Sequence, residues 1–133
     1  MVVLRRAGVL VIVVFVLGLG AVAAGTTKHK WPSPTTLTHP SSTQFAGAVG
    51  SKFKPCRDQR LVTLYYTDPI TGQTQPLSVQ RTNKAGKYEV DLTQPAYGGS
   101  YQAQAPKVTK QRTQICKAAR SNIVTVTGVP PAP

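Results

Sequence analysis

The stretch Arg60–Thr67, RLVTLYYT, carries the clearest fold signal in the chain. Hydrophobic side chains alternate along it, with Val62, Leu64 and Tyr66 on one face. Its β-branched and aromatic residues favour a strand that is buried on one side. The next segment, DPITG at 68–72, has the composition of a turn, because proline fixes φ and glycine accepts a positive φ. We therefore expect a strand here, followed by a turn and a second strand.

Short strands with the same period of two are expected on both sides of this stretch. They cover residues 44–49, 75–82, 87–92, 100–105 and 122–127, with turn sequences such as Asn83–Gly86 between them. The side chains expected to point inward between two sheets are Val62, Leu64, Tyr88, Val90, Tyr101, Ala103, Val124 and Val126. Because no segment shows a convincing helical period, the sequence predicts an all-β sandwich.

The N-terminus has the order of a secretory signal peptide. Arg5 and Arg6 precede the apolar run Val9–Leu17, and a stretch of small residues follows. Removal of residues 1–24 is the favoured interpretation, although the charge-free stretch 7–27 is also long enough for an uncleaved membrane anchor. Under either alternative the Arg pair keeps the N-terminus inside, so we expect the rest of the chain to be secreted or extracellular.

Residues 25–43 are expected to form a linker, or stalk, ahead of the sandwich. Positions 26–43 hold six Thr, three Ser and three Pro, a composition too poor in apolar residues to build a core. Trp31 stands inside this linker and is interpreted either as a docking or sugar-stacking residue or as a loosely packed one. Residues 129–133 are expected to form a Pro-rich tail.

Cys56 and Cys116 are the only cysteines and stand 60 positions apart. In an oxidising compartment such a pair predicts one disulfide, which would stabilise the fold by about 4 kcal/mol in the chain-entropy model. The alternative is a metal site, but the chain has no C-x-x-C and both histidines, His29 and His39, fall in the predicted linker. We therefore predict a disulfide, with no metal and no other cofactor.

Strand-edge and turn motifs recur along residues 44–128. They are Phe45-x-Gly47-x-Val49, Cys56, Arg60-x-Val62-x-Leu64, Thr82 ahead of Gly86-x-Tyr88, Gly99-x-Tyr101-x-Ala103, Cys116 and Val124-x-Val126. This set resembles the carboxypeptidase regulatory-like, or transthyretin-like, domains, in particular exported bacterial versions with a Cys pair. The resemblance implies a Greek-key β-sandwich of six to seven strands, the seventh drawn from residues 106–115. It implies no catalytic residues.

Catalysis is not expected from the residues themselves either. Nucleophilic catalysis needs a base near the nucleophile, and the only histidines fall in the predicted linker. Glu89 and Asp91 share one face of a strand, but that face alternates with hydrophobic positions and is interpreted as solvent-exposed. The sequence therefore predicts that the protein is not an enzyme.

The expected function is a non-catalytic secreted or cell-surface module that binds or supports other components of the cell envelope, with an unknown partner. A first alternative is a cationic protein that binds anionic envelope polymers or lipid headgroups, or nucleic acid, although nucleic acid is not expected as a partner in vivo. A second alternative is a small hydrolase or an enzyme accessory domain, for which Asp68, Glu89 and Asp91 would be the residues to test.

The charge pattern around the cysteines predicts one further feature. The chain holds 16 Lys and Arg against four Asp and Glu, a net charge of +12. The candidate anion-binding residues flank the two cysteines and are Lys52, Lys54, Arg57, Arg60, Lys107, Lys110, Arg112, Lys117 and Arg120. A disulfide would hold the two Cα atoms about 5.5–6 Å apart and gather these charges at one end. The alternative is that they are loop charges that point in different directions and serve solubility.

Overall fold

The strand predicted around Val62 lies at the centre of the larger of two facing sheets. It is β4 (Leu61–Thr67), which pairs antiparallel with β5 (Thr74–Arg81) on one side and β7 (Gly99–Ala105) on the other. Two shorter strands, β10 (Ala119–Arg120) and β11 (Val124–Val126), pair with β7. The computed structural model describes residues 27–129, so the predicted signal peptide and residues 130–133 of the predicted tail lie outside the described residues.

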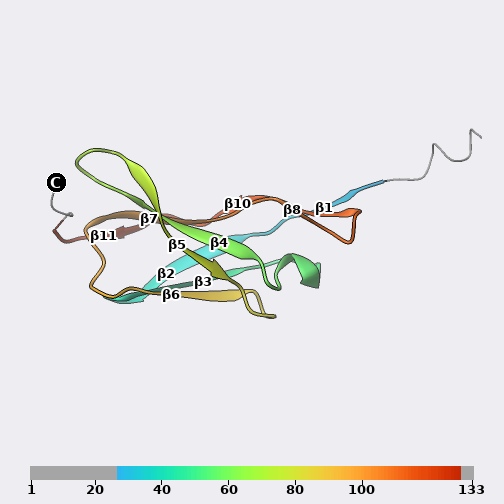
Figure 1. Ribbon diagram of the computed structural model, residues 1–133, viewed down its shortest axis with the longest axis horizontal. Helices are drawn as coiled ribbons and strands as arrows, with labels where there is room; N and C mark the ends of the chain where they lie inside the picture. The colour runs from blue at the N-terminus through green and yellow to red at the C-terminus, as the bar shows by residue number, and fades with distance from the viewer. Residues whose placement is uncertain (1–26, 130–133) are drawn as a thin grey trace, which may run out of the picture.

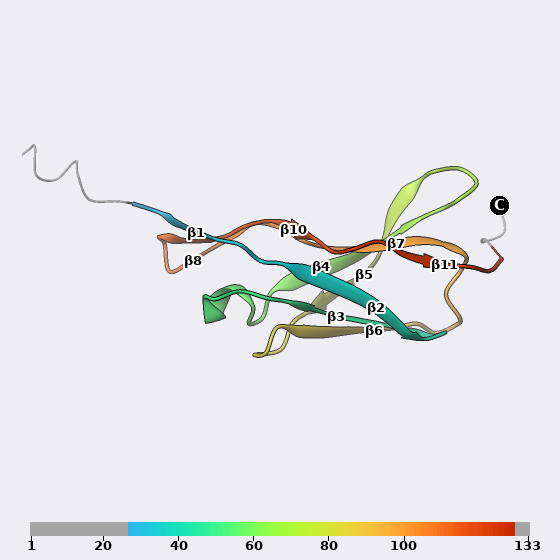
Figure 2. The same ribbon diagram turned by 180° about the vertical axis from the view of Figure 1, so that it is seen from behind.

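A second sheet faces the first and closes the core. Its strands are β2 (Thr35–Ser41), β3 (Gln44–Val49) and β6 (Lys87–Asp91), in the antiparallel order β2-β3-β6. Figures 1 and 2 show the two sheets as layers of an elongated domain. The predicted all-β sandwich is therefore confirmed.

A third, smaller sheet extends one end of the sandwich, on the right in Figure 1. Its strands are β1 (His29–Trp31), β9 (Gln114–Cys116) and β8 (Val108–Lys110), with β1 parallel to β9. The short 3₁₀ helix η2 (Lys54–Cys56) lies at the same end and contacts β8. The turn between β4 and β5 lies toward the opposite end, as does β11.

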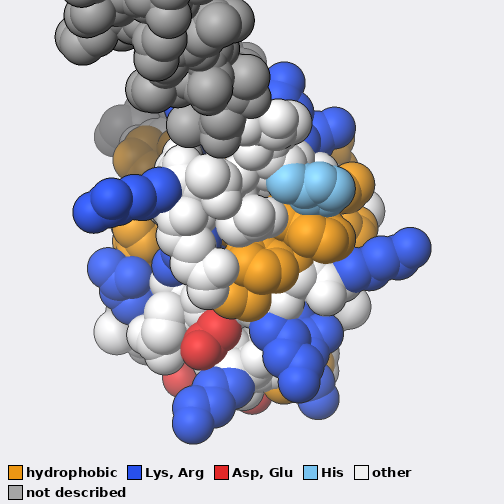
Figure 3. Space-filling view, turned by 90° about the vertical axis from the view of Figure 1, so that its right-hand side faces the viewer, with side chains coloured by type: hydrophobic (Ala, Val, Ile, Leu, Met, Phe, Trp, Pro, Cys, Tyr) orange, Lys and Arg blue, Asp and Glu red, His pale blue; other side chains and the backbone are white. Residues whose placement is uncertain are grey.

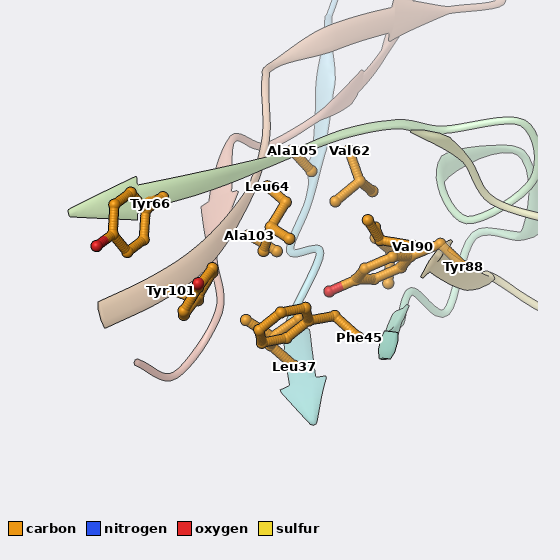
Figure 4. Close-up of a cluster of buried hydrophobic side chains, with 11 residues drawn as sticks. Leu37, Phe45, Val62, Leu64, Tyr66, Tyr88, Val90, Tyr101, Ala103 and Ala105 are labelled. Carbon is orange, nitrogen blue, oxygen red and sulfur yellow. The ribbon is translucent and has the colours of Figure 1, made fainter. Parts of the chain in front are cut away.

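The core fills the space between the facing sheets. Its buried residues are Leu37, Phe45, Val49, Val62, Leu64, Tyr66, Tyr88, Val90, Tyr101, Ala103 and Ala105, most of which Figure 4 labels. Tyr101 lies at the centre of an aromatic group, with ring centroids 4.5 Å from Phe45 and 5.1 Å from Tyr66. Six of the eight residues predicted to point inward are buried, and Val124 and Val126 are partly buried against the same cluster.

The linker predicted at residues 25–43 is corrected by β1 and β2, which form within it. Thr35 and Leu37 alternate with exposed neighbours in β2 and are buried, Leu37 at 2 % exposure. The hydroxyl of Thr38 donates a hydrogen bond of 3.1 Å to the Ala46 carbonyl on β3. A threonine-rich segment can therefore act as an edge strand, because threonine is β-branched and one leucine suffices to reach the core. Composition alone does not separate such a strand from a linker.

The origin of the last sandwich strand is a second correction. Residues 106–115, predicted to supply a seventh strand, contain β8 and the start of β9, which belong to the small end sheet. The sandwich instead takes β2 from the N-terminal side, and the two-residue strand β10 joins the larger sheet, so among the described residues the two facing sheets hold eight strands rather than the predicted six to seven. The polar Lys/Gln/Thr sequence of 106–115 fits a small exposed sheet, since a sandwich strand needs an apolar face.

The Tyr88 side chain spans all three strands of the β2-β3-β6 sheet, and Gly47 makes room for it. Tyr88 of β6 extends across β3, and its hydroxyl donates a hydrogen bond of 2.6 Å to the Thr36 carbonyl on β2. A Cβ at Gly47 would overlap the Tyr88 ring and the same carbonyl. Glycine is therefore required in mid-strand because another side chain occupies its place.

Candidate anion-binding site at the disulfide-bonded end

The two cysteines form the predicted disulfide, which is thereby confirmed. It joins Cys56 at the end of η2 to Cys116 at the end of β9, with Cα atoms 5.3 Å apart and both residues fully buried. A disulfide of this kind indicates an oxidising, extracellular-type environment. Among residues 27–129, no helix has the length and apolar character needed to cross a bilayer.

The prediction that Arg60 belongs to an anion-binding patch is wrong, because its side chain is only 2 % exposed. Its Nη1 donates hydrogen bonds of 3.0 Å to the Cys56 carbonyl and to Ser33 Oγ. Its Nη2 donates hydrogen bonds of 2.8 Å to the Pro106 and Lys117 carbonyls. The guanidinium therefore joins the backbone near both cysteines, at Cys56 and Lys117, to Pro106 and Ser33. It is not accessible to a ligand.

Burial also makes the charged form of this guanidinium less favourable than it is in water. Desolvation lowers the pKa of Arg60 from its usual value, and its Nε has no hydrogen-bond partner. Its four close acceptors are all neutral oxygens rather than carboxylates. Arg60 is thus a structural cation, and sequence pattern alone could not separate it from its exposed neighbours.

The other predicted cations divide into two groups. Lys52, Lys54, Lys107, Arg112 and Lys117 are exposed, and Arg57 and Lys110 are partly exposed, in the segments next to the disulfide. Arg120 lies apart from them, on the outer side of the larger sheet, where it pairs with Gln104 and lines a shallow hollow with Thr63 and Tyr65. The disulfide therefore brings seven of the nine predicted residues to one end as accessible charges.

Further cations join this end that sequence reasoning missed. Arg81 lies where β5 ends, and its Nη1 donates a hydrogen bond of 3.2 Å to the Gln59 carbonyl. Lys84 lines the same hollow as Lys54 and Lys110. Lys87 is the first residue of β6, Lys30 lies in β1, and Lys28 directly precedes β1. The sequence does show this clustering of cations, because residues 61–80, 88–106 and 121–129 contain no Lys or Arg and the positive charges fall in the segments between them.

We call this surface the basic end. It consists of Lys28, Lys30, Lys52, Lys54, Arg57, Arg81, Lys84, Lys87, Lys107, Lys110, Arg112 and Lys117. Figure 3 looks onto it and shows Lys and Arg side chains around a central hydrophobic surface. Only one acidic residue, Asp58, belongs to the segments that form it, and its Oδ1 is buried without a hydrogen-bond partner.

The hydrophobic centre of the basic end holds an aromatic groove of about 600 Å³. The rings of Trp31 and Phe53 stack with centroids 5.2 Å apart and planes inclined by 13°, and His29 lies 4.2 Å from Trp31 on centroids. The Trp31 Nε1–H donates a hydrogen bond of 2.6 Å to Gln114 Oε1 and so fixes the indole against β9. The groove is lined by His29, Lys30, Trp31, Pro32, Pro34, Ser51, Lys52 and Arg57.

A further hollow lies toward the opposite end and is apolar. Its volume is about 170 Å³, below the range of about 300–1,000 Å³ that is usual for small-molecule sites. Tyr66, Leu92 and Tyr101 line it beneath the loop 93–97. None of the described residues that line it carries a charge at physiological pH, and burial raises the pKa of Tyr101 to about 12. The basic end is therefore the better candidate site.

The acidic residues considered for catalysis, Asp68, Glu89 and Asp91, line neither this apolar hollow nor the aromatic groove. Glu89 and Asp91 are exposed on β6, and Asp91 accepts a hydrogen bond of 3.1 Å from Gln44 Nε2. Asp68 caps the β4–β5 turn by accepting a hydrogen bond of 2.7 Å from the Ile70 amide. Within residues 27–129, no group of three or more His, Cys, Asp or Glu side chains is arranged to hold a metal ion.

Comparisons with known proteins give a likeness in structure alone. No protein-family model matches the chain, and no curated protein matches it either. Among solved structures, the chain is similar to the FN5 domain of Drosophila Lar, with a TM-score of 0.43 and 14% sequence identity. That match covers 73% of this chain and 96% of the Lar domain. The likeness is that of a distant β-sandwich and says nothing about a ligand.

Proposed function

We propose that this chain is a non-catalytic binding module of the cell envelope and that its basic end binds an anionic polymer. The observation that supports this most strongly is the distribution of charge. Within residues 27–129, every exposed or partly exposed Lys and Arg except Arg120 belongs to the basic end. Solubility alone would be served as well by charges spread over the whole surface.

The arrangement suits a long, repetitive anion better than a small one. The cations come from four separate segments, residues 28–30, 52–57, 81–87 and 107–117, and in the described part of the chain they line three different hollows rather than one pocket. Each ion pair with such a ligand contributes little, but many of them add and release counterions together. Binding of this kind is strong at low salt and weakens steeply as salt is added.

Three further assignments belong to the same proposal. The first is export, supported by the disulfide and by the signal-peptide pattern of residues 1–24. The second is membership of the carboxypeptidase regulatory-like domains, supported by the strand-edge motifs of residues 44–128. The third is the absence of catalysis, supported by Glu89 and Asp91 lying on an exposed strand face, outside both the aromatic groove and the apolar hollow.

The test compares two variants that have the same net charge. One removes four exposed cations of the basic end: Lys52→Ala, Lys54→Ala, Lys84→Ala and Lys117→Ala. The other adds four acids at exposed positions toward the opposite end: Gln73→Glu, Gln75→Glu, Gln94→Glu and Thr125→Glu. Binding of each to an immobilised anionic polymer is measured over a series of salt concentrations.

The basic-end variant is expected to bind more weakly and to show a shallower dependence of log K on log salt, by roughly one unit for each lysine that pairs with the polymer in the wild type. The acid-addition variant should keep nearly the slope of the wild type, because its basic end is intact. Equal effects of the two variants would mean that only net charge matters and would contradict a localised site.

A further inference from the structure

The basic end combines two kinds of surface that suit different parts of one ligand. The indole of Trp31, which stacks on Phe53, lines the groove as an aromatic surface, and Lys30, Lys52 and Arg57 line the groove around it. None of the described residues that line this groove is acidic. A ligand that fits must therefore present both a flat apolar face and negative charge.

We propose that the groove is a stacking subsite for an acidic polysaccharide, in which a pyranose ring lies on Trp31 and its charged groups meet the surrounding cations. One face of a pyranose ring carries C–H bonds that pack against the negative face of an aromatic ring. Carboxylate or phosphate groups at the ring edge would then face the lysines and Arg57. This inference rests on the proposed function and names the ligand class of the same site.

Three features of the groove support a fixed platform. The Trp31 Nε1–H is held by Gln114 Oε1, so the indole is oriented before any ligand arrives. Phe53 backs the indole at a centroid distance of 5.2 Å. Arg57 is restrained as well, because its Nη1 donates a hydrogen bond of 3.4 Å to the Ser51 carbonyl. Side chains that are already ordered lose less entropy on binding.

A polysaccharide is favoured over a nucleic acid by the setting of the site. The disulfide indicates an oxidising, extracellular-type environment, where charged sugars rather than nucleic acids are the expected polymers. Single-stranded nucleic acid could use the same stacking and charge, since bases also pack on aromatic rings. Nucleic acid is therefore an outcome of the test rather than a second proposal.

Trp31 is the only tryptophan in the chain, so its fluorescence reports directly on the groove. The disulfide-bonded protein is titrated with hexagalacturonate, with neutral maltohexaose, with hexametaphosphate and with heptathymidylate, a nucleotide probe of comparable charge. Affinities are also measured by calorimetry for Trp31→Leu and Phe53→Leu. Tyr97→Leu, which removes an exposed aromatic ring toward the opposite end, is the matched control.

We expect a saturable change of Trp31 emission with hexagalacturonate, an affinity about tenfold weaker in Trp31→Leu, and no change in Tyr97→Leu. Maltohexaose should bind much more weakly, because it has no charge. Equal binding of hexametaphosphate with no effect of Trp31→Leu would overturn the stacking subsite while leaving the proposed function intact. Tighter binding of heptathymidylate would overturn the polysaccharide assignment. Failure of every anion to bind would overturn both.

Discussion

Arg60 is the residue whose removal the structure most clearly predicts to be costly. Arg60→Met keeps most of the length of the apolar stem but removes the guanidinium. Three backbone carbonyls, those of Cys56, Pro106 and Lys117, would lose a donor within 3.0 Å. The Cys56 carbonyl and Ser33 Oγ lie in buried hydrogen bonds, so water cannot easily replace the lost donor there.

Each buried acceptor left without a donor costs about 1–3 kcal/mol. Two such acceptors, partly offset by no longer burying a cation, give an expected destabilisation of about 3 kcal/mol. Urea unfolding of the disulfide-bonded protein measures this directly. Arg120→Met is the control, because Arg120 is exposed, and its effect should stay within about 0.5 kcal/mol.

A further comparison separates a structural role from a binding role. Arg60→Met should bind anionic polymers with the salt dependence of the wild type at temperatures where it is folded, because the guanidinium is buried. An Arg60→Met variant as stable as the wild type would refute the reasoning. It would show that desolvation of the guanidinium costs as much as its hydrogen bonds return.

Three further predictions concern stability. Cys56→Ala/Cys116→Ala should lose about 4 kcal/mol in the chain-entropy model, measured by urea unfolding, and should regain part of it at high salt, because repulsion within the basic end is then screened; a loss below about 1 kcal/mol would contradict the first part. Leu37→Ala should cost about 2–5 kcal/mol, as expected for a buried core leucine in β2, whereas a linker residue would cost almost nothing. The free energy of unfolding should fall as pH rises above about 10, because tyrosines in the unfolded chain ionise near their usual pKa, whereas burial raises the pKa of Tyr101 to about 12 and that of Tyr88 further. The expected fall is up to about 1.4 kcal/mol per pH unit for each tyrosine. Unfolding of Tyr88→Phe over the same pH range should show a smaller fall.

The strands that could be predicted from the sequence are those in which apolar and polar side chains alternate. Val62, Leu64 and Tyr66 of β4 alternate with polar neighbours, and the same holds for Tyr88 and Val90 of β6. Alternation of this kind follows from the geometry of a strand and needs no knowledge of its neighbours. The disulfide was equally predictable, because the chain has only two cysteines.

The strand β2 could not be predicted in the same way. Its only large apolar residue is Leu37. Its other contacts with β3 include hydrogen bonds of threonine hydroxyls and the His39 ring, which stacks on Phe45. Such a strand is defined by the partner that receives it, and a composition rich in Thr, Ser and Pro is shared with true linkers. The sequence therefore predicts the seventh strand from the wrong part of the chain, residues 106–115, when β2 supplies a strand instead.

The candidate site was partly predictable. Lysines next to the two cysteines had to approach one another once the disulfide formed. The inclusion of Arg81, Lys84 and Lys87 depends on where strands begin and end, which requires the topology. Arg60 differs from its neighbours only through burial, and the stacking of Trp31 on Phe53 joins residues that the sequence placed in separate regions.

The location of polyanion binding can be measured directly with amide chemical shifts of the ¹⁵N-labelled protein during titration with an anionic polymer. If the basic end is the binding site, the shifts should concentrate in residues 28–32, 51–59, 81–87 and 107–117 and should disappear together as salt is raised. Residues 68–73 and 93–98, in the turn and loop toward the opposite end, should remain unchanged. Shifts spread evenly over the domain, or concentrated in those two segments, would contradict a binding site at the basic end.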